Sequence, residues 1–256
     1  METNETGVVL VHGAFSVPEH LSGLATRLES TGYRVTRVRL RGHAASGERR
    51  PHGARLTDYL QDVLDAVDQY RTPPVVVGHS MGGLLALRAS QERRCAAALL
   101  LAPAPAAPLL PTVAVLPVYA TILHRVLAGL VVDPPRAGLA RHALGGFDEP
   151  TRREVLGLFV PESGAAFRDM MFGLMRVDPR RVSCPVAMAF GDQDAIVPRI
   201  QLLSTARRYA ATVFRYPTLG HFMVGERAWE PAEDDVVHWL TQVAPPVDQQ
   251  SESGAR

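Results

Sequence analysis

The chain has 256 residues, of which 46% are hydrophobic, and this suffices for one sizeable core in a single domain that carries an insertion. Lys and Arg together number 27 and Asp and Glu 26, so the charge balance gives no argument for a nucleic-acid or anionic-membrane partner. Cys95 and Cys184 lack the CxxC spacing of a metal site, and both adjoin apolar runs. We expect two buried thiols, with no disulfide framework and no bound metal.

The N-terminal residues and the apolar runs of the chain bear on targeting and membrane insertion. The first residues, METNETG, lack a basic segment, and nowhere does the chain hold an apolar run of about 18 residues. We therefore expect neither a signal peptide nor a membrane span, which makes the cytoplasm the default location. The polar residues 245–256 are expected to form a disordered tail. The oligomeric state is left open between monomer and homodimer.

Short apolar or partly alternating runs predict strands, and apolar residues at helical spacing predict helices. In chain order, the predicted strands are residues 8–12, 34–40, 74–77, 96–101, 185–190 and 212–216. The predicted helices are residues 21–28, 56–70, 82–91, 200–210 and 228–243. Because strands alternate with helices and most strands are continuously apolar, we expect an α/β fold with a mostly parallel sheet covered on both faces. In such a sheet, ligands bind at the carboxyl ends of the strands.

The alternation breaks between the fourth and fifth strands. Roughly 80 residues, 103–181, are too many for a bare loop, so we expect a helical insertion in a core made of residues 1–102 and 182–244. Residues 119–132 are apolar and typical of a helix. A second apolar face has helical spacing and consists of Phe167, Met170, Met171, Leu174 and Met175. Packing onto the core and lining a substrate site as a lid are compatible roles for this face.

Residues 75–83 read VVVGHSMGG, with Ser80 between glycines at the end of a predicted strand. Glycines two residues before and after the serine allow a sharp turn from strand to helix that exposes the hydroxyl. This is the G-x-S-x-G pattern of a nucleophile elbow. An ordinary glycine-bearing turn is the alternative, but the strand before, the helix after and the available partners favour a nucleophile.

A serine nucleophile needs a base and an orienting carboxylate. Of the nine histidines, His221 has the best context, because it follows Gly220 just past the last predicted strand. Asp192 and Asp194 follow the fifth strand; we favour Asp194 as the orienting acid and expect Asp192 to hydrogen-bond its own turn. His79 is expected to point elsewhere. For the other histidines we expect two loop-pinning residues, His12 and His43, and five without an identifiable partner: His20, His52, His124, His142 and His238.

Acyl transfer also requires donors for the oxyanion of the tetrahedral intermediate. Met81 offers its N–H at the start of the helix that follows Ser80. The second donor is expected from the loop after the first strand, where Gly13 allows close approach and Ala14 supplies the N–H.

Taken together, the chain resembles the α/β-hydrolase-fold serine hydrolases, and among them lidded esterases and lipases, over nearly its whole length. The resemblance rests on His12-Gly13-Ala14-Phe15, Arg41-Gly42-His43, Gly78-His79-Ser80-Met81-Gly82-Gly83, Gly191-Asp192-Gln193-Asp194 with Ile196-Val197-Pro198, and Gly220-His221-Phe222. It implies the order Ser80, Asp194, His221 for nucleophile, acid and base. A serine at the elbow argues against dehalogenases and epoxide hydrolases, which use an aspartate there. Arg39 and Ala44 depart from the pattern that relatives often show around Arg-Gly-His.

The function that we expect is hydrolysis of a carboxylic ester, thioester or lactone of a moderately apolar small molecule, with no metal or organic cofactor. The residues expected to form the apolar pocket are Phe15, Met171, Met175, Ile196 and Phe222. A lyase, cyclase or acyltransferase of specialised metabolism is the alternative, because the fold hosts such reactions with the same triad. The many Arg, Ala and Pro residues are typical of a high-GC bacterial coding sequence, in which such pathways are common. A ligand-binding protein that retains the fold is a third hypothesis.

Overall fold

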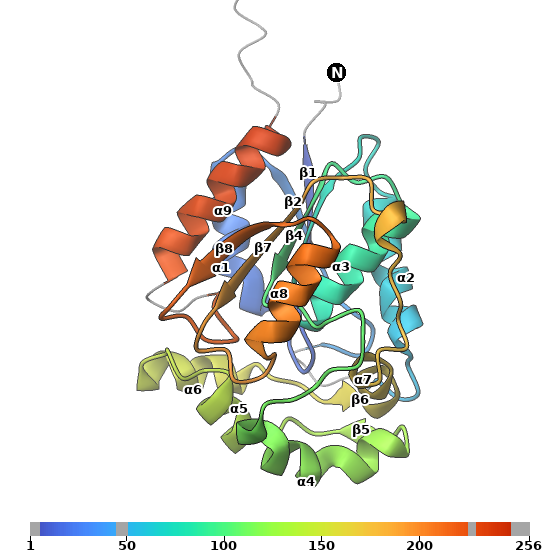
Figure 1. Ribbon diagram of the computed structural model, residues 1–256, viewed down its shortest axis with the longest axis vertical. Helices are drawn as coiled ribbons and strands as arrows, with labels where there is room; N and C mark the ends of the chain where they lie inside the picture. The colour runs from blue at the N-terminus through green and yellow to red at the C-terminus, as the bar shows by residue number, and fades with distance from the viewer. Residues whose placement is uncertain (1–5, 45–50, 225–228, 247–256) are drawn as a thin grey trace, which may run out of the picture.

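A parallel sheet of six strands runs through the centre of the molecule, in the order β2-β1-β3-β4-β7-β8 (Figure 1). The computed structural model describes residues 6–44, 51–224 and 229–246. The strands are β1 (Gly7–Val11), β2 (Arg34–Val38), β3 (Val75–His79), β4 (Ala97–Leu101), β7 (Val186–Gly191) and β8 (Thr212–Tyr216). Neighbouring strands pair in parallel throughout. The predicted strands are therefore present, and the predicted parallel α/β sheet is confirmed.

Helices cover both faces of this sheet, which is why β1, β3, β4 and β7 are buried along their whole length. Successive side chains of a strand point to opposite faces. One face packs against α1 (Ser22–Ser30) and α9 (Glu230–Val243). The other face packs against α2 (Leu56–Val67), α3 (Met81–Glu92) and α8 (Arg199–Arg208). Figure 1 shows α1 and α9 on one side of the strands and α2 and α3 on the other.

The amphipathic pattern predicted for residues 56–70 accounts for the position of α2. Tyr59, Leu60, Val63 and Val67 are buried against the sheet. The helix begins after Arg55, whose N–H donates to the Asp58 carboxylate at 2.7 Å, so one exposed backbone donor of the first turn is satisfied.

The chain between β4 and β7, called here the insertion (residues 103–181), forms a separate group of elements. It consists of η2 (Val113–Val115), α4 (Leu116–Leu127), β5 (Val131–Val132), α5 (Arg136–His142), α6 (Glu149–Gly157), β6 (Glu162–Ser163), α7 (Gly164–Met171) and η3 (Pro179–Arg181). Figure 1 shows these helices beyond the carboxyl ends of the strands, at the end of the molecule opposite the start of β1. A shorter element, η1 (Pro18–Leu21), lies between β1 and α1.

Two expectations about the insertion were wrong in extent. The helix expected over residues 119–132 is α4, which ends at Leu127 because Gly129 adopts a positive φ of 68°. Residues 131–132 are instead the short strand β5, which pairs antiparallel with β6. The helix with Phe167 and Met170, α7, ends at Met171, and Gly173 follows with a φ of 61°. Met175 therefore does not continue the helical face.

Further expectations concern the cysteines and the tail. Cys95 and Cys184 are free thiols, but they are half-buried rather than buried; each lies two residues before the amino end of a strand, β4 or β7. Pro245 of the expected tail is described, and its carbonyl accepts a hydrogen bond from the Thr6 hydroxyl at 2.7 Å. Residues 247–256 lie outside the described part of the chain.

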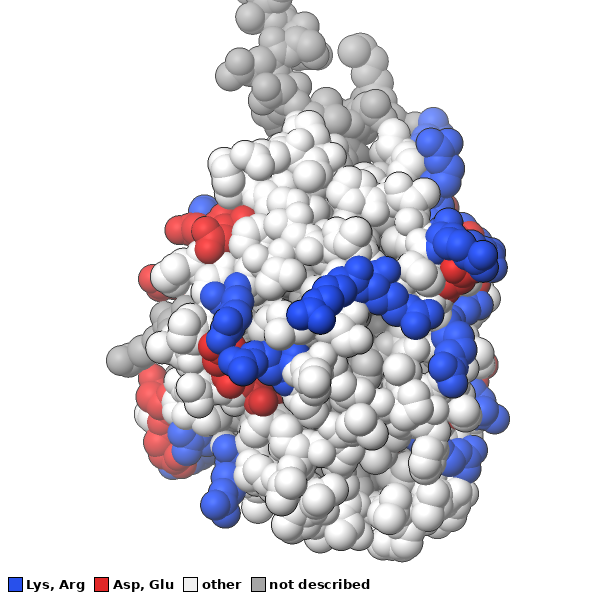
Figure 2. Space-filling model, viewed as in Figure 1, with Lys and Arg blue, Asp and Glu red and all other residues white. Residues whose placement is uncertain are grey.

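The surface of the insertion carries several exposed leucines, including Leu116, Leu123 and Leu127 of α4. In the view of Figure 2, charged side chains lie mainly along the flanks and across the middle, and the lower centre, over the insertion, is largely uncharged. Within the described residues, no helix combines the length and the hydropathy that crossing a bilayer requires.

Candidate active site

Ser80 lies at the turn between β3 and α3, with φ 54° and ψ −118°. A positive φ is unfavourable for a residue with a side chain, so the surrounding structure must hold this conformation. The Ser80 N–H donates to the Leu101 carbonyl at 2.9 Å, and the Ser80 carbonyl accepts from Gly83 and Ala104 N–H, both at 2.9 Å. The turn is therefore fixed on both sides while the hydroxyl stays free to meet other groups.

The glycines around Ser80 are required by close backbone contacts. A Cβ on Gly78 would lie 2.0 Å from the Gly82 carbonyl oxygen. A Cβ on Gly82 would lie 2.2 Å from the Val11 carbonyl oxygen. Neither position has room for a side chain, because α3 begins directly against β1 and β3. The sequence pattern thus corresponds to the sharp strand-to-helix turn that it predicts.

The predicted partners of Ser80 form one chain of hydrogen bonds. His221 Nε2 is 3.0 Å from Ser80 Oγ, and His221 Nδ1 is 2.8 Å from Asp194 Oδ2. A carboxylate only accepts, so Nδ1 carries the proton and Nε2 presents its lone pair to the serine hydroxyl. The side chains of His221 and Asp194 are 7% and 2% exposed, so the pair is shielded from water. This arrangement can remove a proton from Ser80.

Asp192, the other carboxylate after β7, turns to a different partner. Its two oxygens accept from Arg215 Nε and Nη2 at 2.7 and 2.8 Å. The expectation that Asp192 would bond its own turn was wrong, because an arginine on the neighbouring strand β8 offers a two-pronged ion pair. Hydrogen bonding to Arg215 holds the pKa of Asp192 below its usual value.

His79, next to Ser80 in sequence, supports the loop that carries His221. Its Nε2 donates to the His221 carbonyl at 2.9 Å, and its ring contacts the Phe222 ring at a centroid distance of 5.0 Å. Burial, together with the nearby His221, lowers the pKa of His79 to about 3. His79 is thus a neutral, buried hydrogen-bond donor.

The loop after β1 lies directly beside Ser80. A Cβ on Gly13 would come within 3.1 Å of Ser80 Cβ, and Ala14 borders the same cavity as the serine hydroxyl. Met81 is the first residue of α3, whose first N–H groups have no acceptor within the helix. Ala14 and Met81 therefore approach Ser80 from different elements, the loop after β1 and helix α3.

A cavity opens over Ser80 and His221 and extends into the insertion. It encloses roughly 780 Å³, part of it open to solvent. Its lining is mostly apolar, and α4 and α5 of the insertion form the wall that faces the sheet. Two polar side chains of the insertion, Tyr119 and His142, also line it. Burial raises the pKa of the Tyr119 hydroxyl, so Tyr119 is neutral.

The residues expected in the pocket fall into two groups. Phe15, Ile196 and Phe222 line the cavity, whereas Met171 and Met175 do not. Because α7 ends at Met171, the residues that reach the cavity from this helix are Phe167 and Met170, which the same apolar pattern contained. Tyr119 and His142 were not predicted. The apolar spacing of residues 115–122 could have indicated a helix that packs against the core, but not which of its side chains line the cavity.

Three other histidines hold loops around the site. His12 and His43 do so as expected, through Gly13, Leu40 and Arg41 backbone groups. His20, for which we expected no partner, is buried, accepts from Val17 N–H and donates to the Val155 carbonyl of the insertion at 3.0 Å. No cluster of three or more potential metal ligands occurs among the residues that the structure describes.

Comparisons with known proteins agree with this arrangement of sheet and site. A model of the alpha/beta hydrolase family matches residues 8–234 of the chain. A monoacylglycerol lipase of Mycolicibacterium smegmatis is 27% identical over 255 residues, which span 93% of this chain and 89% of that protein.

Solved structures show the same fold. A crystal structure of Paleococcus ferrophilus monoacylglycerol lipase has a TM-score of 0.71 at 21% identity, with 93% of this chain and 95% of that chain covered. An esterase from Thermogutta terrifontis has a TM-score of 0.70 at 21% identity, with 93% and 90% covered.

Proposed function

Because the chain belongs to the alpha/beta hydrolase family, we propose that it is a serine hydrolase that cleaves a carboxylic ester of a moderately apolar small molecule. The observation that carries the proposal is the continuous chain of hydrogen bonds from Asp194 through His221 to Ser80 at the base of an apolar cavity. The monoacylglycerol lipase and esterase relatives support the same class of reaction.

The first half of the reaction forms an acyl-enzyme. His221 Nε2 takes the proton of the Ser80 hydroxyl while Oγ bonds to the ester carbonyl carbon. The carbonyl electron pair moves to oxygen, where the Ala14 and Met81 N–H groups stabilise the negative charge. His221 then gives its proton to the alkoxide, the carbon–oxygen bond breaks and the alcohol leaves.

The second half releases the acid. A water molecule gives a proton to His221 Nε2 and its oxygen bonds to the acyl carbon. The resulting oxyanion collapses, Ser80 Oγ recovers the proton from His221, and the free acid departs. Asp194 keeps the imidazole in the required tautomer and stabilises the imidazolium in both halves.

The substrate class follows from the cavity. Its apolar lining favours an uncharged ester with a hydrocarbon chain, and long polar chains would lose hydration there without gaining partners. In this proposal the core is residues 1–102 and 182–244, and the insertion 103–181 is the lid that forms the distal wall of the pocket. Monoacylglycerols are the first substrates to test, since two of the relatives act on them by name.

The test is covalent labelling with a fluorophosphonate, followed by peptide mass spectrometry, on the wild type, Ser80→Ala and His221→Ala. We expect an adduct on Ser80 that is lost in both variants. In parallel, release of acid from p-nitrophenyl esters and monoacylglycerols should occur with the wild type alone.

Two results would contradict the proposed ester hydrolase. Labelling of Ser80 without net hydrolysis, but with transfer of the acyl group to an added alcohol or amine, would replace the hydrolase by an acyltransferase. Absence of both adduct and turnover in the folded wild type would refute the proposed function.

A further inference from the structure

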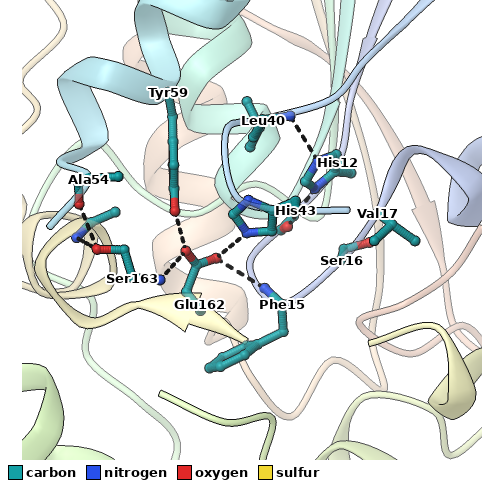
Figure 3. Close-up of polar contacts among 12 residues, drawn as sticks. His12, Phe15, Ser16, Val17, Leu40, His43, Ala54, Tyr59, Glu162 and Ser163 are labelled. Carbon is teal, nitrogen blue, oxygen red and sulfur yellow. Dashed lines mark hydrogen bonds and ion pairs between the residues drawn. The ribbon is translucent and has the colours of Figure 1, made fainter. Parts of the chain in front are cut away.

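Glu162 is a carboxylate with no exposed surface, although it belongs to the insertion rather than to the core of the sheet. It lies in β6 and reaches the loop after β1, which carries Ala14. Figure 3 shows its two oxygens at the meeting point of groups from the loop after β1, the loop after β2 and helix α2. The reaction steps above give this buried group no role.

Four hydrogen-bond donors converge on the two oxygens of Glu162. Oε1 accepts from the Tyr59 hydroxyl at 2.6 Å and from Ser163 N–H at 2.7 Å. Oε2 accepts from Phe15 N–H at 3.1 Å and from His43 Nε2 at 3.1 Å. An ionised carboxylate offers about four acceptor positions, so it matches this set of donors, whereas an amide would turn an NH₂ group toward two of them.

His43 balances the buried charge. Its Nε2 donates to Glu162 and its Nδ1 to the Arg41 carbonyl at 3.2 Å, so both ring nitrogens face groups that only accept. This pattern requires the imidazolium. Burial opposes the charged form, but the Glu162 carboxylate outweighs it and raises the pKa of His43. In turn, burial alone would raise the pKa of Glu162, yet His43 and the hydrogen bonds hold it below its usual value.

The backbone of Phe15 is held by the insertion at both of its polar groups. The Phe15 N–H donates to Glu162, and the Phe15 carbonyl accepts from Val160 N–H at 2.9 Å. Phe15 has a φ of 60°, in the left-handed region that is unfavourable for a residue with a side chain. The Phe15 N–H belongs to the peptide unit that directly follows Ala14, so holding this N–H restrains the stretch of loop that carries the Ala14 N–H.

We propose that Glu162 is a positioning residue that fixes the loop after β1, so that the Ala14 N–H is aimed at the carbonyl oxygen of the substrate. The proposal rests on the proposed function, in which that N–H stabilises the oxyanion. The insertion then takes part in building the oxyanion site, because Val160 and Glu162 hold Phe15 in its unfavourable backbone conformation.

Asp169 provides a matched control. It is a second buried carboxylate that ties the insertion to the core, through Arg55 Nε and Nη2 at 2.6 and 2.8 Å and Leu56 N–H at 3.3 Å. It makes no hydrogen bond to the loop after β1. Loss of Asp169 therefore reports what a buried link between insertion and core contributes to stability without disturbing Ala14.

The experiment compares Glu162→Gln, Asp169→Asn and the wild type in the full chain, with p-nitrophenyl butyrate as substrate. We expect Glu162→Gln to lower kcat by about 10- to 100-fold, since loss of an oxyanion donor costs roughly 100-fold or more and displacement costs less. KM should stay within about threefold, because the donor acts on the transition state. Asp169→Asn should lower the melting temperature to a similar degree and leave kcat within about threefold.

A second variant and a second measurement distinguish failure of the positioning role of Glu162 from failure of the proposed function. Val160→Pro removes the other donor to Phe15 and leaves the ion pair intact. Residue 160 lies outside any helix or strand and precedes Pro161, which favours extended conformations that proline can adopt. It should also lower kcat more than KM. Hydrogen–deuterium exchange of the Ala14 and Phe15 amides should be faster in Glu162→Gln and unchanged in Asp169→Asn.

Equal kcat losses in Glu162→Gln and Asp169→Asn, or an unchanged kcat in Glu162→Gln and Val160→Pro, would overturn the positioning role. If the wild type neither labels nor turns over, the proposed function fails and hydrogen exchange decides alone. Faster exchange of the Ala14 and Phe15 amides in Glu162→Gln alone then supports the proposal that Glu162 fixes the loop after β1. Equal exchange in Glu162→Gln and Asp169→Asn rejects it.

Discussion

The two oxygens of Asp194 have separate partners. Oδ2 accepts from His221 Nδ1, whereas Oδ1 accepts from Ile196 and Val197 N–H at 2.8 and 2.9 Å. The backbone bonds fix the carboxylate and the carboxylate fixes the imidazole. A negative charge alone at position 194 would therefore not be enough, because the orientation of the His221 imidazole depends on both oxygens of Asp194.

Asp194→Asn should lower kcat for ester hydrolysis by about three to four orders of magnitude. The amide accepts at one atom only, so it either loses the backbone bonds or favours the tautomer in which Nε2 carries the proton and cannot take that of Ser80. The measurement is steady-state hydrolysis of a p-nitrophenyl ester at pH 7.5. Asp192→Asn removes a carboxylate two positions away that pairs with Arg215, and it should keep kcat within about threefold. Similar losses in both variants would contradict the assignment.

Local patterns predicted the residues of the elbow and its partners, because each follows a strand within a few residues of a glycine. Ser80, Asp194 and His221 could therefore be chosen without knowledge of the sheet order. Glu162 could not, since its partner His43 is 119 positions away and Glu162 itself carries no local signal. A buried carboxylate of this kind is recognisable only from the converging donors.

At the level of elements, the elbow depends on the close approach of α3 to the strands. Gly78→Ala should lower the free energy of unfolding by about 1–3 kcal/mol, because the new Cβ meets backbone at Gly82 that cannot rotate away. Thermal unfolding should show a drop of several degrees. Gly23→Ala in α1, where a Cβ meets nothing within 4 Å, should leave stability unchanged or raise it. If Gly78→Ala leaves the free energy of unfolding unchanged, the turn at Ser80 accommodates a Cβ at position 78 and the argument from close contact is wrong.

Helix α4 is expected to set the length of the chain that the pocket accepts. Ile122 lines the cavity and is 7% exposed, whereas its neighbour Leu123 is 40% exposed on the outer face. Ile122→Phe should lower kcat/KM for p-nitrophenyl octanoate relative to acetate by about tenfold, since excluding two methylene groups forfeits about 1.6 kcal/mol of burial. Leu123→Phe should leave the ratio unchanged. A ratio that shifts equally in both variants would place the acyl chain elsewhere.

The elements of the core were more predictable than those of the insertion, for a physical reason. Core strands are buried on both faces and therefore read as apolar runs. In the insertion, α4 and β5 lie in one mostly apolar stretch, and the positive φ of Gly129 marks the break between helix and strand. Likewise, the end of α7 depends on Gly173, which an apolar spacing pattern overlooks.

For the molecule as a whole, buried histidines join the elements around the site. His12, His20 and His79 are buried and neutral, and burial is the main cause that lowers the pKa of each. Their hydrogen bonds connect the segment after β1 to the loop after β2 and to the insertion, and the end of β3 to the loop after β8. The fold is therefore expected to lose stability in acid before its carboxylates titrate.

The direction in which pH changes the free energy of unfolding follows from the pKa values of a histidine in the folded and unfolded chain. For His79 the folded pKa is about 3 and the ordinary value 6.5, so below pH 6.5 the unfolded chain takes up a proton that the folded chain refuses. The free energy of unfolding falls as the pH drops below 6.5 and continues to fall toward pH 3. From pH 7.5 to 5.5 this one group accounts for a loss of about 1.4 kcal/mol.

His79→Gln should remove that part of the pH dependence. Glutamine keeps an N–H donor for the His221 carbonyl but binds no proton in this range, so the loss between pH 7.5 and 5.5 should be about 1.4 kcal/mol smaller than in the wild type. Urea unfolding at the two pH values measures it. His238→Gln, on the exposed face of α9, removes an imidazole without altering the buried set and should leave the wild-type pH dependence in place. If His79→Gln retains the full loss, His79 takes up a proton equally in the folded and unfolded chain, and burial does not lower its pKa.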